Sequence, residues 1–225
     1  MNHSQQPLRA LIDKKIEPLH WEDGPFYYPG LTRIRTIGGP SALFHAILLA
    51  YFLPYRTNKI NHEVVNRHDM IKKLRESLAL KLHQLAFPDQ GSDLRVYDCL
   101  GKGKNKLVAA AIKSYSIEVM QSELLDTDFF IDDKYLELIS NEIGKDIYFI
   151  DSRTKNVYVK SEDTDIFYKG RPSIVILILP NHFELIGIAS KDDSDNLITH
   201  FSPDSPFIEY IRESYNQLKE LQSYN

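Results

Sequence analysis

The stretch Gly38-Gly-Pro-Ser-Ala-Leu-Phe-His-Ala46 decides the fold of this chain. A tight turn leads into residues 42–52, which are apolar nearly all round, and a helix that is apolar on every face is buried at the centre of a domain. Ser41 is expected to be the N-cap of this helix and Pro54 to end it. The first N–H groups of a helix have no partner within the helix and the dipole is positive there, so a thiolate at this position would be stabilised. The residue at that position is an alanine, Ala42.

Two kinds of periodicity divide the rest of the chain. Apolar residues recur at helical spacing in three further stretches, at 62–87, 107–125 and 132–143. β-Branched and alternating patterns predict strands at 146–151, 156–160, 173–179, 182–188 and 197–201, before a closing amphipathic helix at 206–221. Residues 1–37 contain four prolines and predict loops and short helices, with their aromatic side chains packed onto the main core. Helices followed by a sheet, without a repeat or a linker, predict one α+β domain.

The composition of the chain restricts its class of partner. Of the 225 residues, 43% are apolar and 26% are charged, as in an ordinary globular protein. The 31 acidic residues outnumber the 27 basic ones, which argues against nucleic acid, because phosphate binding needs a surplus of Lys and Arg. A polar N-terminus and short apolar runs predict no membrane insertion. The single cysteine, Cys99, cannot form an intrachain disulfide, which indicates the reducing cytoplasm.

A second segment with possible chemistry is Pro180-Asn-His-Phe-Glu184, between two predicted strands. Alternation along a strand puts His182 and Glu184 on the same face. A carboxylate two residues from an imidazole can orient the ring and fix its tautomer, as the third member of a catalytic triad does. Taken alone, a histidine at the start of a strand is more often a surface or core residue.

Together, the two segments resemble the ovarian-tumour (OTU) family of cysteine proteases, which remove ubiquitin. The family's nucleophile motif, Asp-Gly-Asn-Cys-Leu-Phe followed by Arg or His and Ala, aligns with Gly39-Pro-Ser-Ala-Leu-Phe-His-Ala46, and its histidine motif aligns with His182-Phe-Glu184. Residues 130–140 resemble the segment that usually starts with Trp-Gly, and 141–151 resemble the helix and strand that follow it. The resemblance implies a papain-like α+β fold with helices packed on a small, mostly antiparallel sheet. It divides the chain into an N-terminal extension (1–35), a catalytic core (36–190) and a C-terminal strand and helix (191–225).

The resemblance also implies a role for each residue that matches a motif. Ala42 stands at the position of the nucleophilic cysteine, His182 would be the general base, and Glu184 would orient it. The backbone at Gly39 and Ser41 would form the oxyanion hole.

The same resemblance implies a substrate and a channel to hold it. The activity would be thiol-dependent hydrolysis of isopeptide bonds after the C-terminal glycine of ubiquitin or a ubiquitin-like modifier, including polyubiquitin chains, without a metal or organic cofactor. Phe130 and Phe183 would flank the channel for the Gly-Gly tail. Because that tail is basic before its glycines, acidic residues should rim the channel, and the candidates are Asp126, Asp128, Asp132 and Asp133. The expected location is the cytoplasm, or the host cytoplasm if the protein is a viral or bacterial effector.

The chain departs from the family's pattern at three places. Gly39-Pro40 replaces Asp-Gly, and Pro40 has no N–H to donate to an oxyanion. Phe130-Ile131 replaces the common Trp-Gly. Ala42 has two interpretations: a cysteine changed to alanine, which would trap a substrate complex, or a natural pseudoenzyme that binds ubiquitin without cleaving it.

Other interpretations remain open. Cys99 is the only thiol but has no helix start after it like the one at residue 42, so it is expected to be structural. His62 and His68 lack the His-Glu-x-x-His spacing of a zinc protease. If the chain is instead an unrelated α+β protein, residues 38–46 and 182–184 should lie far apart in the fold.

Overall fold

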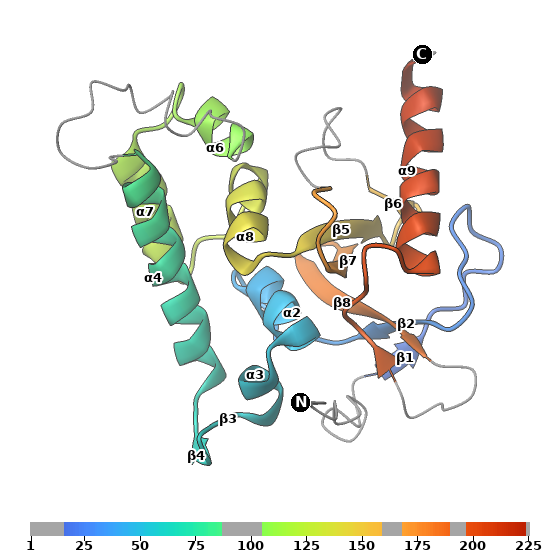
Figure 1. Cartoon of the computed structure of the whole chain (residues 1–225), viewed down its shortest axis with the longest axis horizontal. Helices are drawn as coiled ribbons and strands as arrows, with labels where there is room; N and C mark the ends of the chain where they lie inside the picture. The colour runs from blue at the N-terminus through green and yellow to red at the C-terminus, as the bar shows by residue number, and fades with distance from the viewer. Residues whose placement is uncertain (1–15, 87–104, 159–167, 190–196, 224–225) are drawn as a thin grey trace.

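The computed structural model describes residues 16–86, 105–158, 168–189 and 197–223, and its centre is a seven-stranded sheet (Figure 1). The strand order is β1 (Ile16–Pro18), β2 (Leu31–Ile34), β8 (His182–Ala189), β7 (Ser173–Leu179), β5 (Asp146–Asp151) and β6 (Asn156–Val157), with β9 (Leu197–Ile198) paired to β8. Only β5 and β7 run parallel, and every other pair is antiparallel. The predicted α+β class with a mostly antiparallel sheet is confirmed.

Strand β7 is apolar from Ile174 to Leu179 because it lies in the middle of the sheet, between β5 and β8. Its alternate residues belong to two different cores: Ile174 and Ile176 pack in the larger one, and Val175 and Leu177 in the smaller one. A strand covered on both faces has no polar side, which is why a continuous apolar run predicted it correctly.

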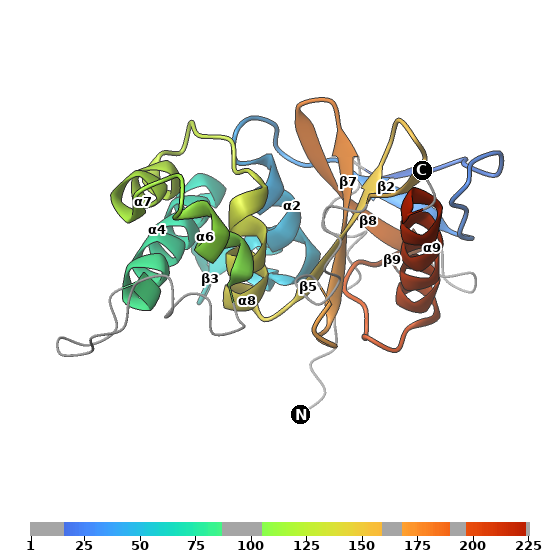
Figure 2. The same cartoon turned by 90° about the horizontal axis from the view of Figure 1, so that it is seen from above.

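Helices cover both faces of this sheet (Figure 2). The larger core packs one face against α2 (Ala42–Tyr51), α4 (Arg67–Ala86), α7 (Ile117–Leu125) and α8 (Leu136–Ile143), with the short elements α3 (Leu53–Thr57), α6 (Lys106–Ala111) and η1 (Asp133–Tyr135) beside them. The smaller core packs the other face against α9 (Pro206–Ser223) and against Trp21 and Phe26. These aromatic residues are buried as expected, but in the smaller core and not in the main one. Helix α2 is buried along nearly its whole length, as predicted.

The structure corrects part of the prediction for residues 1–37, of which it describes 16–37. Besides loops, this part contains two strands, β1 and β2, which extend the sheet from β8, and it contains no helix. Each has three or four residues, too few for an alternating pattern to stand out. Strand β2 is stabilised by pairing with β8, more than 150 residues away, with Leu31 opposite Ile188, and β1 in turn pairs with β2.

Three helix boundaries also differ from the prediction. Helix α2 ends at Tyr51, and Pro54 lies in the first turn of α3, where its missing N–H costs nothing. The stretch 107–125 is broken into α6 and α7, because the Ser116 side chain caps a new helix by accepting from the Val119 N–H. The helix predicted at 62–87 begins only at Arg67, as α4, because a small hairpin of β3 (Lys59–Ile60) and β4 (Glu63–Val64) precedes it.

Some predicted features fall outside the described residues. These are the polar N-terminus and Cys99. Among the helices that the structure describes, none combines the length and the apolar character needed to cross a membrane.

Candidate active site

Three segments that are distant in the sequence meet at one end of the sheet (Figure 2). They are the turn that leads from β2 into α2, the start of β8 after the β7–β8 hairpin, and the loop that follows α7. Two distances show that they are close in pairs: the position a Cβ would take on Gly38 is 3.9 Å from Cε1 of His182, and the Ser41 hydroxyl lies 3.5 Å from the Thr127 carbonyl oxygen. The two predicted motifs are therefore neighbours, which argues against an unrelated protein in which they would lie far apart.

The His182 imidazole is held between the turn and its own strand, with 24% of its side chain exposed. Its Nε2 lies 3.5 Å from Oγ1 of Thr36 and 3.9 Å from Oε1 of Glu184, while Nδ1 is on the side that faces Gly38. The Thr36 hydroxyl donates its one proton to the Phe183 carbonyl oxygen at 2.6 Å, so toward His182 it can only accept. This favours the tautomer with the proton on Nε2, which leaves the Nδ1 lone pair facing the turn.

Glu184 lies on the same face of β8 as His182, as alternation predicted. It is buried, and its Oε2 has no hydrogen-bond partner within the described structure. A guanidinium nitrogen of Arg33 lies 3.7 Å from that oxygen, while Arg33 also bonds Glu17 on β1. The strands that the sequence analysis missed thus supply the cation nearest to this carboxylate.

Position 42 is the first residue of α2, with 1% of Ala42 exposed. The Ala42 N–H donates to the Gly39 carbonyl at 3.0 Å and so closes the turn. Gly39 adopts a φ of +98°, a conformation that residues with a Cβ rarely take. Because the Ala42 N–H is used in this bond and Pro40 has none, Gly39 and Ser41 remain the predicted oxyanion donors from this turn.

The prediction that Ser41 is the N-cap is right for its position but wrong for its side chain. Ser41 occupies the N-cap position, but its hydroxyl makes no capping bond to the helix. Instead, Oγ accepts from Nε and Nη2 of Arg75 at 3.2 and 3.1 Å. Arg75 competes for this oxygen with a charged donor, which binds more strongly than a neutral backbone N–H.

The predicted acidic and aromatic residues are divided by the fold. Asp126 and Asp128 are exposed in the loop beside Ser41, and 54% of Phe130 is exposed just after them. Asp132, in contrast, caps η1 and pairs with Lys134, which is the role of a solvated cap. Phe183 is half-buried and packs against the larger core.

His45 lies one turn into α2 from position 42 and is buried. Its Nδ1 pairs with the Tyr55 hydroxyl, and its ring meets that of His68 edge to face. Burial lowers the pKa of His45 to about 4, with smaller contributions from the charges of His68, Arg67 and His182. His45 is therefore neutral at physiological pH and belongs to the packing under the site.

Sequence reasoning missed three polar residues here, Thr36, Arg33 and Arg75. For Arg75 a signal exists, because it occupies the apolar stripe of α4 at helical spacing from Ile71 and Leu78. A charged residue on a buried stripe needs polar partners inside the protein. Thr36 and Arg33 carry no such signal, since their neighbours come from the other end of the chain.

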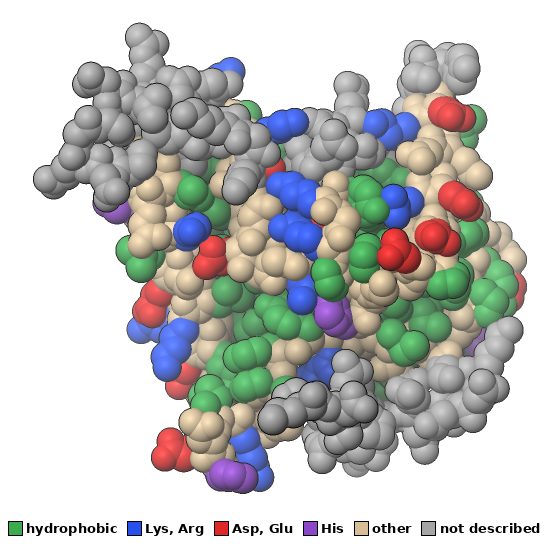
Figure 3. All heavy atoms as spheres, viewed as in Figure 1, with side chains coloured by type: hydrophobic (Ala, Val, Ile, Leu, Met, Phe, Trp, Pro, Cys, Tyr) green, Lys and Arg blue, Asp and Glu red, His purple; other side chains and the backbone are tan. Residues whose placement is uncertain are grey.

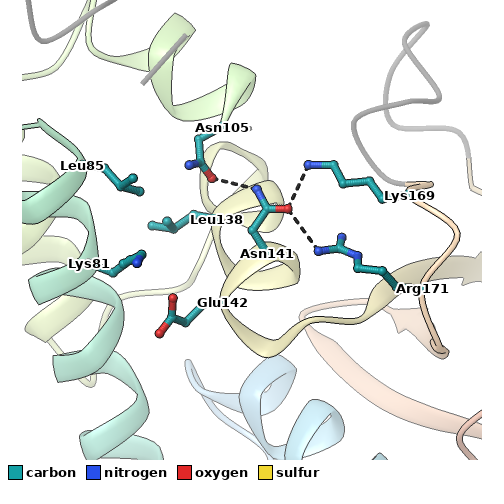
Figure 4. A pocket seen from close by; sticks show the side chains of 8 residues that line it. All are labelled: Lys81, Leu85, Asn105, Leu138, Asn141, Glu142, Lys169 and Arg171. Carbon is teal, nitrogen blue, oxygen red and sulfur yellow. Dashed lines mark hydrogen bonds between the residues drawn. The ribbon is translucent and has the colours of Figure 1, made fainter. Parts of the chain in front are cut away.

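A separate pocket of about 490 Å³ lies between α4 and α8 (Figure 4) and contains none of the predicted site residues. Figure 3 shows Lys and Arg side chains gathered over this part of the molecule. Two of these cations are already paired, Lys169 with Glu137 and Arg171 with Asp146, and Asn141 accepts from both. The charges are therefore balanced, and the network holds α8 to the segment before β7.

Within the part of the chain that the structure describes, no three His, Cys, Asp or Glu side chains are grouped as a metal site would need. No family model and no curated protein matches the chain. A solved structure of an ovarian-tumour (OTU) domain in complex with ubiquitin is similar over 84% of each chain, with a TM-score of 0.49 and 17% identity.

Proposed function

We propose that this chain is an OTU-type, ubiquitin-directed thiol hydrolase that lacks its nucleophile. In the form with cysteine at position 42, it would hydrolyse isopeptide bonds after the C-terminal glycine of ubiquitin or a ubiquitin-like modifier. With Ala42 it would hold that tail without cutting it. The observation that carries the proposal is the contact between the turn before α2 and His182, whose Nδ1 faces the turn while Nε2 faces Thr36 and Glu184.

The chemistry follows from this arrangement. A thiol at position 42 would give its proton to Nδ1 of His182, and the thiolate would attack the scissile carbonyl carbon. Glu184 would stabilise the imidazolium through Nε2–H, as the carboxylate of a triad does. As the C–N bond breaks, His182 would pass the proton to the leaving lysine amine. Water would then hydrolyse the thioester.

The rim of the site suits a basic, extended tail. Asp126 and Asp128 are exposed beside the helix start, and Phe130 offers an apolar surface next to them. The carboxylates would attract the basic residues that precede the two glycines of ubiquitin, and the exposed ring would cover the tail.

A covalent trapping experiment tests the proposal. The Ala42→Cys protein is incubated with ubiquitin that carries a thiol-reactive C-terminal warhead, and the adduct is mapped by peptide mass. We expect modification at position 42 and not at Cys99, and at least about 100-fold slower modification in Ala42→Cys/His182→Ala, because the thiolate would lose its base. Equal rates with and without His182 would contradict the assigned base.

Ala42 itself favours a second candidate, a natural binder. The proposal then predicts measurable ubiquitin binding by the chain as given, even if the cysteine variant forms no adduct. Neither adduct nor binding would mean that the modifier is not ubiquitin or that the likeness ends at the fold.

A further inference from the structure

Arg75 is a buried cation that the proposed chemistry does not use. It projects from α4, has no exposed surface, and lies with its guanidinium carbon 5.0 Å from the centre of the Phe44 ring. Taking an arginine out of water is costly unless its donors are satisfied. The groups around Arg75 must therefore satisfy its hydrogen bonds.

All of the Arg75 nitrogens are bonded, and their acceptors come from two segments of the candidate site. One segment is the turn before α2, where Ser41 Oγ accepts twice. The other is the end of α7 and the loop after it, where the acceptors are the carbonyl oxygens of Asp126 and Phe129, both at 2.8 Å, and more distantly those of Glu123 and Leu124. A single side chain thus joins the start of α2 to the acidic loop.

None of these acceptors carries a formal charge. A hydroxyl and backbone carbonyls satisfy the hydrogen bonds of the guanidinium but do not neutralise it. Burial lowers the pKa of Arg75, and the Asp126 and Asp128 carboxylates oppose that shift from the surface of the loop. An arginine remains protonated even so, and the result is a fixed positive charge bonded to the residue that precedes position 42.

We infer that Arg75 is a positioning residue of the candidate site, which holds Ser41 against the loop at 124–129 and places a permanent positive charge beside position 42. This charge adds to the positive end of α2, and both would stabilise an anion at the nucleophile position. The inference rests on the proposed function only in taking position 42 as the place of the nucleophile.

The test measures the thiol directly and needs no ubiquitin. The rate at which iodoacetamide alkylates the thiol introduced at position 42 is followed against pH in Ala42→Cys, with peptide mass separating it from Cys99. In Ala42→Cys/Arg75→Gln we expect the pKa of the introduced thiol to rise by about one unit, which is about tenfold less alkylation well below that pKa. Arg75→Lys, which keeps the charge, should restore most of the reactivity. Lys72→Gln removes an exposed charge from the same helix and should leave the profile unchanged.

Other charged groups near the thiol are controlled in the same series. They are His182 and Glu184 on β8, Asp126 and Asp128 on the loop, and His45 on α2, which is neutral above about pH 5 because its pKa is about 4. In Ala42→Cys/His182→Ala, where Arg75 is intact, the thiol pKa should stay below the ordinary value of about 8.5. An ordinary pKa in this variant would contradict the inference even if Arg75→Gln does not fold.

Two results would overturn the inference: an unchanged alkylation profile in folded Arg75→Gln, or an ordinary thiol pKa once His182 is removed. A role in folding alone would alter stability without moving this profile. Failure of the proposed function is distinguishable, because ubiquitin would then neither bind nor react while the dependence of the thiol on Arg75 persisted.

Discussion

The guanidinium of Arg75 is sealed and fully bonded, with its shortest contacts at 2.8 Å, whereas the imidazole of His182 is partly exposed and lies 3.5–3.9 Å from its partners. These residues represent two halves of the candidate site. The helical half consists of Ser41, Arg75 and the loop at 124–129, and the sheet half of Thr36, His182 and Glu184. The helical half is held by short hydrogen bonds to Arg75, while the contacts of His182 in the sheet half are longer.

This difference separates what the residue at position 42 affects from what it does not. Ala42 offers no reactive side-chain atom, and Arg75 still joins the turn to the acidic loop. The surface offered to a peptide tail is therefore built independently of the thiol. Changes in the acidic loop of the helical half should mainly alter binding, changes at Arg75 should also alter the reactivity of a thiol at position 42, and changes in the sheet half should mainly alter reactivity toward the ubiquitin warhead.

The largest effect is expected from acid in the packing beneath the helical half. His45 has a pKa of about 4 when folded, against about 6.5 when unfolded, so the unfolded chain takes up the proton first. Stability is complete above about pH 6.5 and falls between there and pH 4, by up to about 3 kcal/mol from this residue. Urea unfolding at pH 7 and pH 4.5 measures it.

The matched variant for this prediction is His45→Gln, which cannot titrate. It should have a smaller difference between the two pH values, although not zero, because burial also lowers the pKa of His200. The same pH dependence in both proteins would mean that His45 is not responsible.

The next effect concerns the sheet half. In the Ala42→Cys background, Glu184→Gln keeps the shape of the side chain but removes the charge that stabilises the imidazolium. The rate of adduct formation with the ubiquitin warhead should fall at least about tenfold, while the unfolding midpoint changes little. Glu209→Gln, an exposed change on α9, is the control. If both variants react at the parental rate, Glu184 has no part in orienting His182.

Reversal of charge on the acidic loop should weaken binding about tenfold. The Asp126→Lys/Asp128→Lys protein, with Ala42 retained, is compared with Glu209→Lys by titration with ubiquitin at low salt. The loss should shrink as salt is raised, because exposed charges are screened. Unchanged affinity at low salt would remove both carboxylates from the binding surface.

The smallest effect is expected at Thr36. Thr36→Val removes the hydroxyl that accepts toward Nε2 of His182, and in Ala42→Cys it should slow adduct formation about threefold, since one long contact is lost. Thr36→Ser should recover the parental rate. A rate that is the same in Val and Ser variants would leave the tautomer of His182 to Glu184 alone.

Prediction from the sequence succeeded where the signal was local. The all-round apolar run after Ser41 indicated a buried helix, the β-branched run at 173–179 a covered strand, and the spacing of His182 and Glu184 a shared face, because burial and alternation leave their pattern in neighbouring residues. It failed for β1 and β2, because β2 depends on pairing with the distant β8 and β1 depends on pairing with β2.

The sequence by itself determined that a buried helix starts at Ala42 and that His182 and Glu184 share one face of a strand. Only the tertiary structure decided which groups accompany them. The Ser41 side chain accepts hydrogen bonds from Arg75 instead of capping its own helix, and Thr36 lies beside His182 although the two are 146 residues apart in sequence. Such contacts depend on how helices and strands pack, and the free energy of packing is shared among residues that the sequence does not place side by side.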